Sequence, residues 1–174
     1  MSKPAVRPLR ASDAPAVLDA FQSSDDMVRQ GAVTNPEEAE AYVATQLEAD
    51  RRAFAIVDDD RLVGLIGLTL DHPNRVGWLW YWMNKSHRGR GWASSSATAV
   101  ANWALTSGGC ERLELGHRAN NPLSGNVAAA AGFVREGRER GKFLVDGERI
   151  DVLTYGRLTT DPWPPTPEID FTTS

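Results

Sequence analysis

The segment YWMNKSHRGRGWA, from Tyr81 to Ala93, joins a strongly apolar run to a helix through a loop rich in glycine and arginine. The run at residues 76–83 is predicted to be a β-strand, and alternation of its side chains makes both of its faces apolar. Two apolar faces are typical of a central strand that is covered on both sides. The loop therefore lies at the end of a central strand, where α/β proteins commonly bind ligands.

The composition of this loop favours binding of an anion. Gly89 and Gly91 let backbone N–H groups approach a ligand closely, and the following helix offers unpaired N–H groups and a partial positive charge. Arg88 and Arg90 add two full charges. The loop is a candidate cradle for a pyrophosphate. The alternative is a β-to-α turn that needs its glycines for geometry and has two solvated arginines.

Helices and strands alternate on either side of this segment. We expect strands at 5–9, 53–57, 61–70, 76–83, 112–118, 133–144 and 149–157. We expect helices at 12–24, 36–50, 91–106 and 123–131. The polar segment 25–34 is expected to be a loop. This order mixes hairpins with strand–helix–strand crossovers, which predicts an α/β (α+β) fold: a mixed sheet with helices on both faces.

The length of 174 residues suits one domain. We place that domain at residues 1–158. Residues 159–174 contain four prolines and are expected to form a tail without regular structure.

Composition excludes several classes of protein. The net charge is −4 with no evident basic face, so no nucleic-acid partner is expected. No apolar run reaches the ~18 residues of a membrane helix, and the N-terminal residues lack the apolar stretch of a secretory signal. Three histidines are not spaced as a metal site. The single Cys110 cannot form an intrachain disulfide, so we expect a reducing, cytoplasmic compartment.

Two patterns resemble the GNAT N-acetyltransferases. Residues 88–93 (RGRGWA) are similar to the Q/R-x-x-G-x-G/A acyl-CoA signature of that family. Residues 121–124 (NPLS), followed by AGF at 131–133, are similar to the pattern of its RimJ/RimL branch, the ribosomal-protein N-terminal acetyltransferases. Residues 6–14 also resemble that branch, and the whole resemblance covers about residues 5–158.

The resemblance implies a GNAT-like, mostly antiparallel sheet of about seven strands and acetyl-CoA as cosubstrate. Loop amides would hold the pyrophosphate, the preceding strand end would pair with pantetheine, and the Asn of the second pattern would contact the pantetheine arm. The implied cofactor-binding residues are Tyr81, Trp82, Met83, Arg88, Gly89, Arg90, Gly91, Trp92, Ala93, Asn121 and Ser124.

The same resemblance implies that Ser124 is a catalytic acid for the leaving thiolate. Many other GNAT branches carry a Tyr for that purpose seven residues after Asn121. Here that position is Ala128, so Ser124 is the remaining candidate in the pattern.

Direct transfer to an amine also needs a base, because an ammonium must lose a proton before it attacks. Glu114, in the middle of a strand, is the first candidate for this catalytic role, and an ion pair with Arg112 or Arg118 is its alternative interpretation. His117 is the rival base because its ordinary pKa suits the task. Its alternative is a surface histidine at a strand end.

These patterns together predict an acyltransferase that moves an acetyl group from acetyl-CoA directly to a primary amine. The α-amine of a protein N-terminus is the leading acceptor, and a small amine such as an amino acid, polyamine or drug is the alternative. A non-catalytic acyl-CoA-binding module is the alternative of another class, because the position of the family Tyr is vacant. A homodimer is one possible assembly, with the Trp- and Pro-containing tail covering a neighbour.

Overall fold

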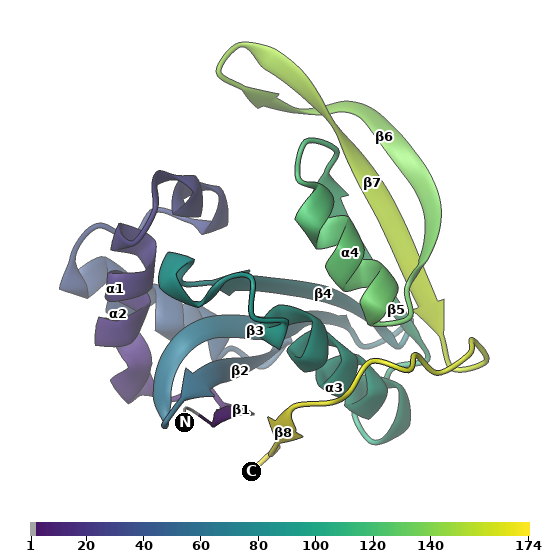
Figure 1. Cartoon of the computed structure of the whole chain (residues 1–174), viewed down its shortest axis with the longest axis horizontal. Coiled ribbons are helices and arrows are strands. Elements are labelled where there is room, and N and C mark those ends of the chain that lie inside the picture. Colours follow the sequence, from purple (N-terminus) through teal and green to yellow (C-terminus); the bar gives the residue numbers. More distant parts are fainter. Residues whose placement is uncertain (1–2) are drawn as a thin grey trace.

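The computed structural model describes residues 3–174, so residues 1 and 2 of the expected domain lie outside the described residues (Figure 1). The strands are β1 (Pro4–Pro8), β2 (Arg51–Asp58), β3 (Arg61–Asp71), β4 (Val76–Met83), β5 (Arg112–Arg118), β6 (Val134–Val145), β7 (Glu148–Leu158) and β8 (Asp170–Phe171). The helices are α1 (Ala14–Gln22), α2 (Pro36–Gln46), α3 (Trp92–Thr106) and α4 (Pro122–Ala130). Short 3-10 helices are η1 (Ala11–Asp13), η2 (Asp25–Gln30) and η3 (Lys85–His87).

The strands form one sheet in the order β6-β7-β5-β4-β3-β2-β1-β8. Only the β4–β5 and β1–β8 pairs are parallel, and the other neighbours are antiparallel. The predicted mixed, mostly antiparallel sheet is confirmed, with one strand more than expected. The apolar strand β4 lies in the interior of the sheet, between β3 and β5, as its two apolar faces predicted.

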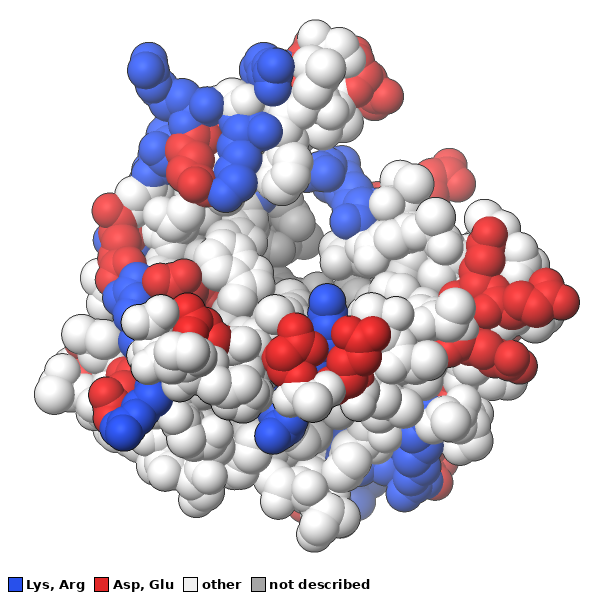
Figure 2. Space-filling model, turned by 180° about the vertical axis from the view of Figure 1, so that it is seen from behind, with Lys and Arg blue, Asp and Glu red and all other residues white. Residues whose placement is uncertain are grey.

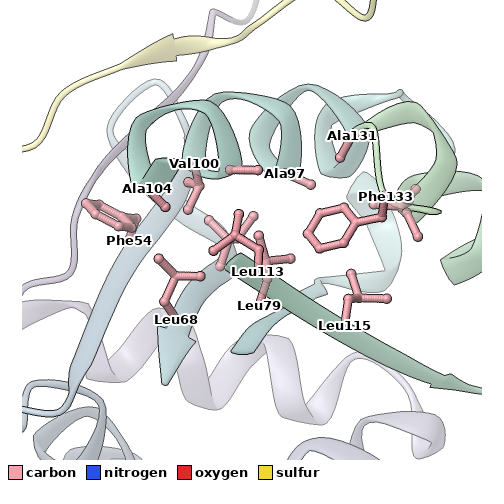
Figure 3. Close-up of a cluster of buried hydrophobic side chains, with 14 of the residues drawn as sticks. Phe54, Leu68, Leu79, Ala97, Val100, Ala104, Leu113, Leu115, Ala131 and Phe133 are labelled. Carbon is pink, nitrogen blue, oxygen red and sulfur yellow. The ribbon is translucent and has the colours of Figure 1, made fainter. Parts of the chain in front are cut away.

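Helices cover both faces of the sheet. One core cluster lies between the sheet and helices α3 and α4, and a second includes side chains of α1 and α2 on the opposite face. Figure 3 shows the first cluster, where Ala97, Val100 and Ala104 of α3 lie over Leu79 and Leu113. Small side chains let α3 approach the sheet closely. Each fully buried leucine contributes about 1.5–3 kcal/mol.

One expectation from the sequence is wrong. The segment 25–34 is not a plain loop, because η2 inserts Met27, which is 1% exposed, into the core beside α1. Of the three tryptophans on one face of β4, only Trp82 is fully buried. Trp78 is 37% exposed because it lies at the start of β4, beyond the second core cluster.

The C-terminal tail also differs from its prediction. Residues Asp170–Phe171 form β8, which pairs with β1, so the tail is not wholly without regular structure. Figure 1 shows the tail crossing over α3 to reach that edge of the sheet. Trp163 lies over the Arg157 guanidinium at 5.2 Å, and Glu168 accepts a hydrogen bond from Asn102 at 2.5 Å. The tail therefore packs on its own chain.

Within residues 3–174, no helix combines the length and the apolar character that crossing a membrane requires. The same residues contain no cluster of three His, Cys, Asp or Glu side chains able to hold a metal ion.

Candidate active site

The site begins where β4 and β5 part. The parallel ladder joins Val76–Trp78 to Arg112–Glu114, and no pairing is formed beyond those residues. The later part of β4 therefore keeps its pairing with β3 on one side and has a free edge on the other. A free strand edge offers N–H and C=O groups to an extended ligand.

The loop after β4 presents a row of free amides. The N–H groups of His87 and Arg88 are bonded to carbonyls of the preceding turn, and the next paired amide is Ser95, which donates to Gly91 O at 3.1 Å. Between them, the amides of residues 89–94 donate to no protein group in the described part of the chain. They include the first turn of α3, whose N–H groups have no partner within the helix.

The two loop glycines leave the space above these amides open. Gly89 and Gly91 have φ angles of +76° and +79°, a left-handed conformation that glycine adopts without strain. A Cβ atom added at either position would meet no atom of residues 3–174 within 4 Å, apart from the chain neighbours. The loop therefore forms an open concave row of donors at a helix N-terminus, which suits a phosphate group.

The Arg88 side chain holds the loop in place. Its Nε donates to the carbonyl of Met83, and its terminal nitrogens donate to both carboxylate oxygens of Asp26 at 2.7 and 3.0 Å. Its guanidinium thus links the end of β4 to η2. Arg90 lies over the Trp92 ring at 5.1 Å. Of the two arginines, it is the one more available to bind an anionic ligand.

Two adjoining cavities meet at the parting of the strands. The first, of about 340 Å³, is lined by the loop, the end of β4, η2 and α4. The second, of about 310 Å³, is lined by β4, the end of β5, η2 and the β6–β7 hairpin. Both cavities are lined by Arg29, Gln30, Tyr81, Asn121 and Ser124. One cavity therefore opens toward the amide row, and the other toward the hairpin.

Ser124 lies at the junction with its hydrogen free to be donated. Its Oγ accepts hydrogen bonds from the Tyr81 hydroxyl at 3.1 Å and from Asn121 Nδ2 at 3.0 Å. Burial raises the pKa of Tyr81, which therefore stays protonated and acts as a donor. With its oxygen accepting two bonds, the Ser124 hydroxyl can direct its own proton to a third group in the cavity.

Comparison with known proteins shows the family of this chain. The family profile described as "Acetyltransferase (GNAT) domain" matches residues 5–134. This chain belongs to the GNAT acetyltransferase family. The ribosomal-protein-serine acetyltransferase of Escherichia coli is 33% identical over 109 residues, which cover 62% of this chain and 60% of that relative. The match thus spans less than two thirds of that relative's length.

Solved structures of other GNAT proteins share the fold. RimL, a ribosomal α-N-protein acetyltransferase in complex with coenzyme A, superposes with a TM-score of 0.81 at 22% identity, covering 90% of this chain and 94% of its own. The dodecameric spermidine N-acetyltransferase of Vibrio cholerae superposes with a TM-score of 0.75 at 19% identity, covering 91% and 95%. The GNAT fold expected from the sequence is confirmed.

The two sequence candidates for the base lie in different places. Glu114 accepts a hydrogen bond from Arg112 Nε at 3.0 Å and lies on the part of β5 that is still paired with β4. It lines neither cavity, so the structure favours the ion-pair interpretation for Glu114 over the catalytic one. His117 is buried and lines the second cavity.

The hydrogen bonds of His117 define its tautomer. Nδ1 lies 2.8 Å from the carbonyl of Arg118, which can only accept, so Nδ1 carries the proton of the neutral ring. Nε2 then accepts from the Tyr155 hydroxyl at 3.2 Å.

Cys110 lies outside both cavities, and burial raises the pKa of its thiol, which makes it a poor nucleophile.

Several features of the site were not found from the sequence. Tyr81 was assigned to pantetheine through its strand position, but its hydroxyl also orients Ser124. Tyr155, the partner of His117, comes from β7 and had no local signal. Arg29 and Gln30 lie in the segment that was expected to be a loop, where the only signal was the apolar pair at residues 27–28.

The Asp26–Arg88 pair predicts a pH-dependent stability. Hydrogen bonding to Arg88 lowers the pKa of the Asp26 carboxyl, so the pair stabilises the fold above the unfolded pKa of ~3.9 and is lost as pH falls through the lower folded value. We expect Asp26→Asn to lower Tm at pH 7 by about 2 °C, the scale of a half-exposed pair. Melting scans from pH 7 to 3 should show this difference shrink toward zero.

Asp25→Asn is the matched control, since Asp25 is exposed and forms no ion pair in the described chain. Its Tm should follow the wild type at every pH. A difference for Asp26→Asn that grows on acidification would contradict the assignment of the ion pair.

Proposed function

We propose that this chain transfers an acetyl group from acetyl-CoA directly to a primary amine, with the α-amine of a protein N-terminus as the principal acceptor. The observation that carries the proposal is the row of free amides at residues 89–94, beside a cavity that leads to Ser124. The sequence identity of 33% over 109 residues to a ribosomal-protein-serine acetyltransferase supports the choice of acceptor. Its named ribosomal substrate also supports a cytoplasmic location.

The residues of the first cavity fit coenzyme A. The amides around Gly89 and Gly91 would hold the pyrophosphate, because their N–H groups are unpaired and the space above them is open. The free edge of β4 at residues 81–83 would pair with the pantetheine arm, and Asn121 would lie beside it. When bound there, acetyl-CoA supplies an activated acetyl group as a thioester.

The side chains at the junction supply the proton transfers. The Ser124 hydroxyl, oriented by Tyr81 and Asn121, donates its proton to the leaving sulfur. An α-ammonium has a pKa of ~8, so removing its proton near neutral pH costs little free energy. His117 lines the second cavity, and its Nε2 is placed to take that proton through a water molecule once the Tyr155 hydroxyl releases its hydrogen bond to that nitrogen.

The test of this function is release of coenzyme A thiol that depends on an added amine. Wild-type protein, acetyl-CoA and a panel of N-terminal peptides and small amines should yield free thiol together with an acetylated amine of matching mass. Binding of acetyl-CoA without thiol release would instead indicate the non-catalytic acyl-CoA-binding module. A small amine that outcompetes every peptide would favour the alternative acceptor class, to which the spermidine acetyltransferase fold relative belongs.

Ser124→Ala should lower kcat with little change in the affinity for acetyl-CoA. The expected loss is about 10- to 100-fold, at the low end of general acid catalysis, because a thiolate with a conjugate pKa near ~8.5 is a tolerable leaving group. Steady-state kinetics with the best amine measure the loss. Ser95→Ala is the matched control, since Ser95 lies one turn into α3 and lines neither cavity. Equal kcat for Ser124→Ala and wild type would remove Ser124 from the mechanism.

A further inference from the structure

The second cavity is lined by positive charge and by aromatic rings. Its charged side chains are Arg29, Arg118 and Lys142, and no carboxylate lies among its lining residues. Arg29 and Arg118 form no ion pair with any described residue, whereas Lys142 is bound to Glu139 at 2.6 Å. Two guanidinium groups that line this cavity are thus available to a ligand.

The two guanidinium groups lie on separate elements around the cavity. Arg29 comes from η2, while Arg118 ends β5 and lies over the Phe143 ring of β6 at 5.0 Å. Figure 2 shows a hollow between the β6–β7 hairpin, where basic side chains gather, and the side formed by α1 and α2, where acidic ones gather. A ligand that extends from Ser124 into this hollow passes between guanidinium groups.

These charges select among amines. An extended polyamine would bring a second ammonium near like charges, which is repulsive and weakly screened over a few ångströms. A carboxylate beyond the reacting amine would instead form charge-assisted hydrogen bonds with a guanidinium, the strongest kind available on a surface.

We propose that the acceptor is the N-terminal α-amine of a peptide whose next few residues are acidic, with Arg118 and Arg29 binding their carboxylates. This inference rests on the proposed function and names the substrate class of the same site. The two guanidinium groups come from different elements, so a peptide with two acidic side chains offers a carboxylate to each, whereas a free amino acid offers a single carboxylate.

The experiment compares peptides that share an N-terminal serine and differ in charge at positions three and four: Ser-Ala-Glu-Glu, Ser-Ala-Gln-Gln and Ser-Ala-Lys-Lys. Free serine and spermidine complete the panel. With full-length protein and saturating acetyl-CoA, kcat/KM should fall about tenfold from the acidic to the neutral peptide and again to the basic one. The differences should shrink at high salt.

Arg118→Glu should invert the order of kcat/KM among the three peptides, so that the basic peptide becomes the best acceptor. Its KM for acetyl-CoA should stay unchanged, because Arg118 does not line the first cavity. Arg140→Glu carries the same charge change on an exposed hairpin residue that lines neither cavity, and it should keep the wild-type order. Arg118→Gln, a milder change, should bring the acidic-to-basic ratio toward one if the charge reversal prevents folding.

Preference for the basic peptide or spermidine would overturn the proposal, as would an unchanged order in both Arg118 variants. Free serine as the best acceptor would overturn its peptide part. An enzyme that acetylates peptides without regard to charge keeps the proposed function and loses only this inference. If no amine is acetylated, the proposed function itself fails.

Discussion

Acetyl-CoA at about 100 times its Kd is expected to raise the Tm of the wild-type protein by roughly 5–10 °C. The Tm of Gly91→Trp should be the same with and without acetyl-CoA. A ligand at that concentration adds about 2.7 kcal/mol to the stability of the folded state, and 1 kcal/mol shifts Tm by about 2–4 °C for a chain of this size. Thermal melting with and without acetyl-CoA measures both shifts.

The expected loss of acetyl-CoA binding in Gly91→Trp follows from the geometry of the loop. Beyond its chain neighbours, no atom of the described residues lies within 4 Å of a Cβ atom at Gly91, so an indole there fills the space above the free amides and not the core. Those amides are the donors assigned to the pyrophosphate, and a bulky side chain prevents a phosphate from approaching them. The change therefore removes ligand binding without removing a packed group.

Gly109→Trp separates this effect from backbone strain. Gly109 has a φ of +82°, close to the +79° of Gly91, and a Cβ atom added there also meets nothing within 4 Å. Both variants pay a similar conformational cost for a side chain in the left-handed region. Only Gly109→Trp should keep the full shift with acetyl-CoA. A full shift in Gly91→Trp, or none in the wild type, would contradict the cofactor site.

A chain that ends at Leu158 is expected to lose about 3 kcal/mol or more of stability, a fall of roughly 10 °C in Tm. The truncation removes β8 and the side chain of Phe171, which packs edge-on against Phe54 and Trp103 at 5.0 and 6.0 Å. It also removes the Trp163 ring that covers the buried Arg157 guanidinium. Burial of large apolar side chains of this kind contributes 1.5–3 kcal/mol each when complete.

A chain that ends at Thr172 is the control for this truncation. It keeps β8 and the hydrogen bond from Thr172 N to Val6 O at 2.9 Å, so its Tm should match that of the full chain. Melting of the three chains without ligand decides the boundary of the folded unit. Equal Tm values for the chains ending at Leu158 and Ser174 would confirm residues 1–158 as the domain and would show that the tail adds nothing.

The sequence was most informative where structure follows from local chemistry. The strand at residues 76–83, the loop and the following helix were predicted to within one residue, because alternation, glycine and the helix N-terminus all act over a few neighbouring residues. The turn between β6 and β7 is equally local, since Asp146 and Gly147 both adopt the positive φ that an Asp-Gly hairpin turn favours.

Contacts between distant segments could not be predicted in this way. Glu114 had two interpretations, and the pairing of β5 with β4, which leaves its carboxylate with Arg112, favours the ion pair. By composition the tail was expected to lack regular structure, because four prolines outweigh two aromatic residues. Its strand exists only because the edge of β1 and the ring of Trp103 offer a surface to Phe171.

The sequence by itself thus determined the order of the main elements, the α/β class and the loop that presents amides to an anion, because each depends on the periodicity and backbone preferences of adjacent residues. The tertiary structure alone decided which side chains meet at the junction of the two cavities. Tyr81 reaches Ser124 across 43 positions of the chain, and Asp26 reaches Arg88 across 62. Such pairs depend on how strands part and helices pack, and no local pattern in the sequence encodes them.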